Sequence, residues 1–174
     1  LGQFQQDPFG ASVLETALAG RHPHLGRWDW ESAADAAKVR EALSLLGLAG
    51  MEQRQVYTLS GGERQRLALA TLLVQAPGVY LLDEPLSHLD LNHQMAVLRL
   101  FSQLAHTQGA AVVMVLHEPA LAHRFCDRAL LIHGDGRCIQ GTADETLTAA
   151  QLSELHAYRL RQISDGDQRC FIPE

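Results

Sequence analysis

Lysine is nearly absent from this chain. Its 174 residues include one lysine, Lys38, and no Gly-Lys pair. The sequence G-x-x-x-x-G-K-[ST], whose backbone amides and lysine hold the phosphates of a bound nucleotide, is therefore missing. Lys38 lies instead in the Ala-rich stretch ESAADAAKVREALSLLG, which is typical of an ordinary helix.

Long apolar runs are missing as well. No run approaches the ~18–20 residues of a membrane span, and the N-terminal stretch LGQFQQDPFG has neither a basic region nor an apolar core. We therefore expect no membrane-spanning helix and no signal peptide. A net charge of −6 gives no support for nucleic-acid binding by bulk electrostatics. The content of 47% hydrophobic and 20% charged residues is ordinary for a soluble globular domain with one core.

The cysteines and histidines do not form metal-binding patterns. The three cysteines, Cys126, Cys138 and Cys170, are scattered and include no C-x-x-C pair, which predicts free thiols in a reducing cytoplasm. The histidines do not form tight i, i+4 sets with acids, so we expect no histidine metal site. Those set aside on this ground are His22, His24, His88, His93, His106, His123, His133 and His156.

The stretch LSGGERQR, residues 59–66, places two glycines at the start of a helix. Ser60 and Glu63 fit the S-x-x-E capping box, and apolar residues follow at helical spacing. A capping box does not explain Gly61 and Gly62, each of which weakens a helix by up to about 1 kcal/mol relative to alanine. Glycines here would leave the helix N-terminus bare, as a surface for phosphate.

Periodicity and turn residues predict the remaining elements. We expect helices over 12–20, 31–46, 60–76, 91–107 and 118–127 and strands over 78–82 and 110–117. Residues 128–133 and 137–141 are expected to form a hairpin, and a short helix is expected after the capping box of Thr142 and Glu145. Two further strands are expected around Asp165-Gly166. The segments 21–30 and 48–58 are interpreted as connections. The run GVYLL is interpreted as a fully buried strand.

Alternation of strand and helix after residue 77 predicts an α/β fold with a parallel sheet. Ligands on such sheets bind at the carboxyl ends of the strands. Asp83, Glu84 and His117 each follow a predicted strand, so they are candidate site residues.

In order along the chain, these motifs resemble those of the ATP-binding subunits of ATP-binding cassette (ABC) transporters. LSGGE (59–63) resembles the family signature, VYLLDEP (79–85) the Walker B strand, LSHLD (86–90) the D-loop, His117 the switch histidine, and Gln3 the Q-loop glutamine. The resemblance extends from Gln3 to about Asp144. It implies a partial P-loop NTPase core, a mostly parallel sheet with flanking helices, and an α-helical subdomain. We expect two domains. Residues 1–77 would form the Q-loop and the α-helical subdomain, which ends in the signature helix, and residues 78–174 would form the C-terminal part of the ATPase core with its C-terminal hairpin.

The resemblance also implies a role for each site residue. Asp83 would bind Mg²⁺ through water, and Gln3 would contribute to the same ion, with Gln5 and Gln6 as neighbouring alternatives. Glu84 would activate the attacking water, and His117 would contact the γ-phosphate of ATP.

Other residues would act across a dimer. Ser60, Gly61, Gly62 and Glu63 would bind the ATP held by a second copy in a head-to-tail dimer, and Asp90, which also fits an N-cap, would lie along the dimer seam.

Three stretches resemble importers of iron-siderophore, haem and cobalamin complexes: ALAGRHPHLGRW, DLNHQ and LHEPALAHRFCDR. This likeness implies a peripheral subunit at the cytoplasmic face of the cell membrane, with permease subunits docked on the helical subdomain and no nucleic-acid partner. The sequence contains no residue that identifies the cargo. Glu118-Pro119 departs from the usual Asp-Leu after the switch histidine.

Because the family places its P-loop before the Q-loop, we interpret the chain as the C-terminal part of a cassette. We expect it to be inactive alone, neither binding ATP tightly nor hydrolysing it. Without the first strands of the cassette, we expect the buried strands to expose an edge and apolar faces, so that the chain is marginally stable or self-associates. Two alternatives stay open: a soluble ABC ATPase without a transporter, and a P-loop-less regulatory or binding module.

Overall fold

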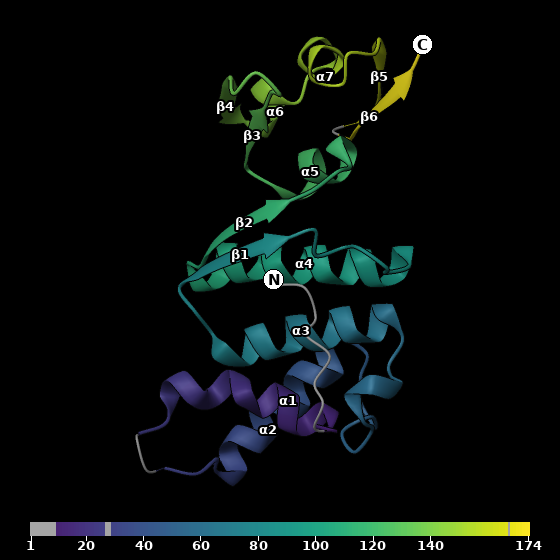
Figure 1. The fold of residues 1–174 in the computed structure, drawn as a ribbon. Helices are drawn as coiled ribbons and strands as arrows, with labels where there is room; N and C mark the ends of the chain where they lie inside the picture. Colours follow the sequence, from purple (N-terminus) through teal and green to yellow (C-terminus); the bar gives the residue numbers. More distant parts are fainter. Residues whose placement is uncertain (1–9, 27–28, 167) are drawn as a thin grey trace. The chain divides into compact units, whose positions relative to one another are not determined.

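In the computed structural model, residues 10–26, 29–166 and 168–174 are described (Figure 1). The chain folds as two compact units, the first ending at Val115 and the second beginning at Leu116.

The N-terminal unit opens with helices that begin at serine capping boxes. Its first elements are α1 (Val13–Leu18), the 3₁₀ helix η1 (Ala19–His24), α2 (Ala33–Leu45), the 3₁₀ turn η2 (Val56–Thr58) and α3 (Gly61–Gln75). Ser12, Ser32 and Ser60 each accept a hydrogen bond from the backbone three residues on, and the acid at that position bonds back. The predicted helices are confirmed because this chemistry is local.

The expectation of an irregular connection over 21–30 was wrong for its first part, which is the 3₁₀ helix η1. A Cβ atom on Gly20 would lie 2.4 Å from the backbone oxygen of Thr71, so only glycine allows this approach to α3. Arg21 donates to the Val74 oxygen at 3.2 Å and pairs with buried Asp35 at 2.8 Å. One ring nitrogen of His24 lies 2.7 Å from the Gln75 oxygen. The stretch AGRHPH therefore covers the carbonyl end of α3, where the helix's own hydrogen bonds run out.

Strand β1 (Val79–Asp83) pairs in parallel with β2 (Ala111–Val115), and α4 (Leu91–Gln108) connects them. The α/β class is thereby confirmed. Asp83 pairs with Val115 at the carboxyl end of the two strands. One face of β1 is buried, and its Tyr80 ring lies 5.5 Å from the ring of Phe101 on α4 in an edge-to-face contact.

The other face of this strand pair is bare. GVYLL is therefore not buried on both faces in this chain, and the expected exposure of apolar strand faces is confirmed. Val79, Leu81, Val113 and Val115 are 57%, 68%, 57% and 49% exposed. An unbroken apolar run does not show which of its alternate side chains will be covered, because both sets are equally apolar.

One hydrophobic core runs across the boundary that we expected at 77/78. It joins Val13, Leu43 and Leu69 from the helices with Leu82 of β1 and Phe101 of α4. The compact units divide after Val115 instead. That residues 1–77 and 78–174 have different functions, as helical subdomain and ATPase core, stays a prediction.

The C-terminal unit holds α5 (Pro119–Phe125), β3 (Arg128–Ile132), β4 (Cys138–Thr142), α6 (Ala143–Thr146), α7 (Ala149–Leu155), β5 (Leu160–Asp165) and β6 (Gln168–Pro173). Strands β3 and β4 form one antiparallel hairpin, β5 and β6 another. Both hairpins were predicted, whereas α7 was not. A small core of Leu131, Ala143, Leu147 and Leu152 holds the unit together.

Within the described residues, no helix has the length and hydropathy to cross a membrane, and no group of three or more histidine, cysteine, aspartate or glutamate side chains could hold a metal ion. Cys126, Cys138 and Cys170 are free.

Candidate functional site

The N-terminus of α3 is built as the capping box predicts. The Ser60 N–H donates to the Glu63 carboxylate at 2.7 Å, and the Glu63 N–H donates to the Ser60 hydroxyl at 3.2 Å. The bond from the Ser60 backbone is the main cause that lowers the pKa of Glu63. Arg54 pairs with Glu63 at 3.1 Å and also donates to the Thr58 oxygen at 3.0 Å. The Glu63 carboxylate therefore stabilises the first turn of α3 through these contacts.

The loop after β1 lies directly against the two glycines. A Cβ atom on Gly62 would lie 2.6 Å from the backbone oxygen of His88, and one on Gly61 would lie 3.5 Å from the His88 ring. We expected both glycines to leave the start of α3 uncovered, but the backbone of His88 covers Gly62. Its missing side chain lets the loop backbone approach, so steric fit alone explains glycine there.

The loop that carries Glu84 is held in a strained conformation. Glu84 and His88 have φ angles of 45° and 64°, in the left-handed region that non-glycine residues rarely adopt. Such strained conformations persist only where contacts with the surrounding structure hold the backbone in place, and they are frequent at functional sites. Here Pro85 is fully buried, and Gln65 of α3 donates to the Glu84 carbonyl at 3.4 Å.

The Glu84 carboxylate itself is exposed, and so is that of Asp83 at the end of β1. The Ser87 hydroxyl donates to the Glu84 carboxylate at 3.1 Å, and the Ser87 N–H donates to the Glu84 carbonyl at 3.2 Å. Two adjacent accessible carboxylates fit a Mg²⁺ ion, which takes one or two protein carboxylates and completes its shell with water and phosphate oxygens.

Asp90 ends the same loop and caps α4, as the alternative interpretation of this residue predicted. Its carboxylate accepts from the His93 N–H at 2.9 Å, and both of its oxygens lie 2.9 Å from Nδ1 of the His93 ring. The backbone bond is the main cause that lowers the pKa of Asp90. The other ring nitrogen of His93 faces Arg66 of α3.

Two predicted site residues stay predictions, because the structure does not place them relative to this site. Gln3 lies outside the described residues. His117 is exposed, follows β2 by two residues and belongs to the C-terminal unit.

Sequence reasoning missed Gln65 and His93, which contact the loop from α3 and α4, and Arg66, which contacts His93. The sequence contained only a weak indication of these residues, because they are polar side chains within amphipathic helices. In the structure they face other elements, and Gln65 is buried. Helical periodicity alone does not show what such side chains contact.

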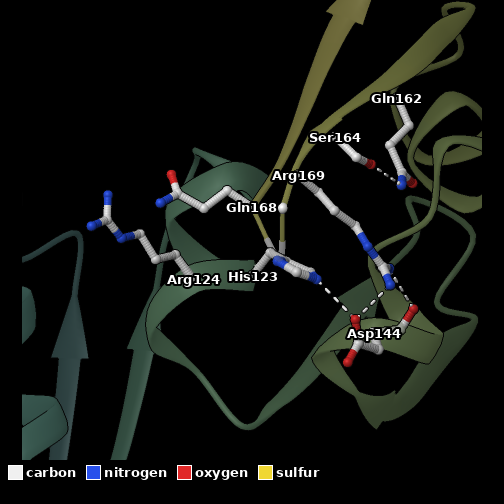
Figure 2. A pocket seen from close by; sticks show the side chains of 8 residues that line it. His123, Arg124, Asp144, Gln162, Ser164, Gln168 and Arg169 are labelled. Carbon is white, nitrogen blue, oxygen red and sulfur yellow. Dashed lines mark hydrogen bonds and ion pairs between the residues drawn. The ribbon is translucent and has the colours of Figure 1, made fainter.

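A separate polar pocket of about 590 Å³ lies in the C-terminal unit (Figure 2). His123 and Arg169 converge there on the Asp144 carboxylate, at 3.0 and 2.6 Å, and the bond from His123 is the main cause that lowers the Asp144 pKa. No predicted site residue that the structure describes lines this pocket.

The sequence profile of the ABC transporter family matches residues 2–87, which include Ser60–Glu63, Asp83 and Glu84. Among solved structures, a metal-chelate type ABC transporter in an inward-facing conformation is 30% identical and superposes with a TM-score of 0.85, over 98% of this chain and 69% of that one. The chain belongs to the ATP-binding family of ABC transporters.

Named relatives within the ABC family are importer subunits. The chain is 43% identical over 129 residues to the cobalamin import ATP-binding protein BtuD of Halobacterium salinarum, covering 74% of this chain and 32% of that protein. It is 38% identical over 150 residues to the petrobactin import ATP-binding protein FpuD of Bacillus anthracis, covering 84% and 54%. A dimeric bacterial ABC transporter cassette is 28% identical with a TM-score of 0.63, over 73% of this chain and 55% of that one.

The hemin import ATP-binding protein HmuV of Burkholderia pseudomallei is 33% identical over 176 residues, covering 96% of this chain and 65% of that protein. The chain therefore spans between about a third and two-thirds of these ABC relatives.

Proposed function

We propose that the complete protein containing this chain is the ATP-hydrolysing subunit of an ABC importer for a metal chelate. The observation that carries the proposal is the packing of the Gly61-Gly62 helix start against the loop that follows Asp83 and Glu84. This packing places a helix N-terminus, which favours anions, beside a loop with two exposed carboxylates.

Asp83 binds Mg²⁺ through water in this proposal, together with Gln3, and ATP supplies the remaining phosphate oxygens. Glu84 accepts a proton from the attacking water or orients it. Its carboxylate is exposed and accepts a hydrogen bond from the Ser87 hydroxyl at 3.1 Å. His117 contacts the γ-phosphate and stabilises the charge that develops during transfer.

The helix start serves the ATP of a second copy. Ser60, Gly61 and Gly62 present backbone N–H groups of the first turn of α3, and the Ser60 hydroxyl adds a polar group beside them. Glu63 keeps this turn in shape. The dimeric cassette among the solved relatives supports a dimer. The head-to-tail arrangement, with Asp90 along the seam, is part of the proposal.

The proposed cargo is a cobalamin, haem or iron-siderophore complex, as the names of the relatives suggest. The helical segment docks on permease subunits at the cytoplasmic face of the membrane. The 174-residue chain alone, without a Gly-Lys pair, is expected to be inactive.

The test is ATP hydrolysis by the complete protein, reconstituted with its permease and carrying Glu84→Gln. We expect kcat to fall at least a hundredfold, as for removal of a general base, with ATP binding retained. Glu41→Gln, an exposed glutamate on α2, is the matched control and should hydrolyse ATP normally. A normal rate in Glu84→Gln would overturn the proposal.

The missing phosphate loop favours a second candidate, a P-loop-less regulatory or binding module. Titration of the isolated chain with a fluorescent ATP analogue separates the two. Tight binding without Gly-Lys would support the module, and no binding is expected if the site depends on residues outside this chain. A soluble ABC ATPase without a transporter is the third candidate, and failure of the complete protein to bind any permease would favour it.

A further inference from the structure

Helix α3 holds the loop from Glu84 to Asp90 at three places. Gln65 donates to the Glu84 carbonyl at the start of the loop, and Gly62 lies against the His88 backbone in its middle. At the end of the loop, Arg66 reaches Asp90 through one intervening side chain, His93 of α4.

The His93 ring has one acceptor partner and one donor partner. Its Nδ1 lies 2.9 Å from both oxygens of Asp90, and since a carboxylate only accepts, Nδ1 carries a proton. Its Nε2 lies 2.9 Å from the Arg66 guanidinium, which only donates. Nε2 is therefore the bare nitrogen of a neutral imidazole.

Arg66 extends this connection to the end of α2. The same guanidinium nitrogen also faces the carbonyls of Leu46 and Gly47, each at 3.0 Å, so its two hydrogens are shared among three acceptors. Gly47 has a φ angle of 67°, and a Cβ atom there would lie 2.9 Å from Arg66 and 3.4 Å from His93 Nε2. Glycine thus provides the space in which the Arg66 and His93 side chains meet.

We propose that His93, as the neutral imidazole with its proton on Nδ1, is a positioning residue that fixes the Asp90 carboxylate and connects the 84–90 loop to the end of α2 through Arg66. Movement of α2 or α3 is then transmitted to Asp90 by hydrogen bonds as well as by packing. The effect on hydrolysis rests on the proposed function, whereas the connection itself does not.

The first experiment measures the tautomer directly. Long-range ¹H–¹⁵N correlation spectra of the ¹⁵N-labelled chain, with His93 assigned through its loss in His93→Gln, report which ring nitrogen carries the proton. We expect a protonated Nδ1 and a bare Nε2 at neutral pH. Replacing Arg66 with methionine should shift the Nε2 resonance and leave that of Nδ1 nearly in place. A proton on Nε2, or an Nε2 resonance indifferent to Arg66, would overturn the proposal.

The second experiment uses the complete protein. We expect His93→Ala and Arg66→Met each to lower kcat for ATP roughly tenfold, about 1.4 kcal/mol of barrier, with KM unchanged. The double variant should be no worse than the more affected single variant, because both break one connection. His93→Gln, which keeps a donor and an acceptor, should recover most of the rate.

His106→Ala is the matched control, since it removes a histidine from the other end of α4. It should change kcat less than twofold. Normal kcat in His93→Ala, or additive losses in the double variant, would contradict the positioning role. If the unmodified complete protein does not hydrolyse ATP, the proposed function fails, and the tautomer experiment still decides whether the connection exists.

Discussion

The backbone oxygen of His88 lies 2.6 Å from the place that a Cβ atom would take on Gly62. The first turn of α3 and the loop after β1 are thus fitted to each other at backbone level. Real Cβ atoms do not approach a carbonyl oxygen so closely, so any larger residue at 62 must push the loop away.

We therefore predict that Gly62→Ala lowers the free energy of unfolding by about 1–3 kcal/mol through overpacking. This loss appears although alanine favours a helix by up to about 1 kcal/mol over glycine. Gly61→Ala is the matched control, because its new Cβ would make an ordinary contact of 3.5 Å with His88, and it should be neutral or stabilising. Urea denaturation followed by circular dichroism measures both, and equal stabilities for the two variants would contradict the packing argument.

The start of α3 shows which features of the site can be predicted from the sequence and which cannot. Ser60 and Glu63 fix the start of α3 through contacts three residues apart, and such local chemistry was predicted at Ser12 and Thr142 as well. The approach of His88 to Gly62 depends on where α3 and β1 come to lie after folding. Nothing near Gly62 in the sequence encodes that distance.

The same distinction applies to the rest of the candidate site. Asp83 and Glu84 were predicted because strand ends in α/β folds gather ligands. Arg66 and His93 are 27 residues apart and meet only because the helices that carry them are packed together. Exposed apolar strand faces were predicted, but the sequence does not show which side chains of GVYLL face outward, because that depends on other parts of the fold.

A second prediction concerns acid stability. Asp35 pairs with buried Arg21 and closes the capping box of α2, and the hydrogen bonds from Ser32 and Arg21 hold the pKa of its carboxyl well below the ordinary value. Because the folded-state pKa is lowered, its stabilisation is complete above the unfolded pKa of about 4 and is lost as the pH falls through the folded pKa.

Asp35→Asn should therefore destabilise the chain at neutral pH and flatten the fall of stability between about pH 4 and 2, the window set by the unfolded pKa. Guanidinium denaturation across this range measures the slope. Glu41→Gln, on the exposed side of the same helix, should leave the slope as in the unmodified chain. An unchanged acid slope in Asp35→Asn would show that other carboxylates account for it.

A third prediction concerns the bare face of the β1–β2 pair. Exposed apolar side chains in a strand pair favour association between copies, so the isolated chain should self-associate in sedimentation velocity runs. Leu81→Lys, which changes a side chain that is 68% exposed, should reduce association at little cost in stability. Leu82→Lys, next to it but 2% exposed, should unfold the chain because it buries an unpaired charge. A monomeric, highly stable unmodified chain would argue against this interpretation.

The last prediction tests whether the two halves of the proposed site act across a dimer. If Ser60 of one copy serves the ATP bound beside Glu84 of the other, Ser60→Arg and Glu84→Gln should each inactivate both sites of a homodimer of the complete protein. Mixing the two variants should then restore one intact site in every mixed dimer, since one copy supplies a normal Glu84 and its partner a normal Ser60. With random exchange, half of the dimers are mixed and carry one working site of two, so about a quarter of the normal rate should return.

The control for this mixing experiment places both substitutions on one copy and mixes it with the unmodified protein. Each mixed dimer then has one site without Glu84 and one without Ser60, so mixed dimers should contribute no activity. Native mass spectrometry verifies that exchange has occurred. If activity fails to return when Ser60→Arg and Glu84→Gln copies are shown to mix, the helix start of α3 serves its own chain's nucleotide, and the head-to-tail arrangement is wrong.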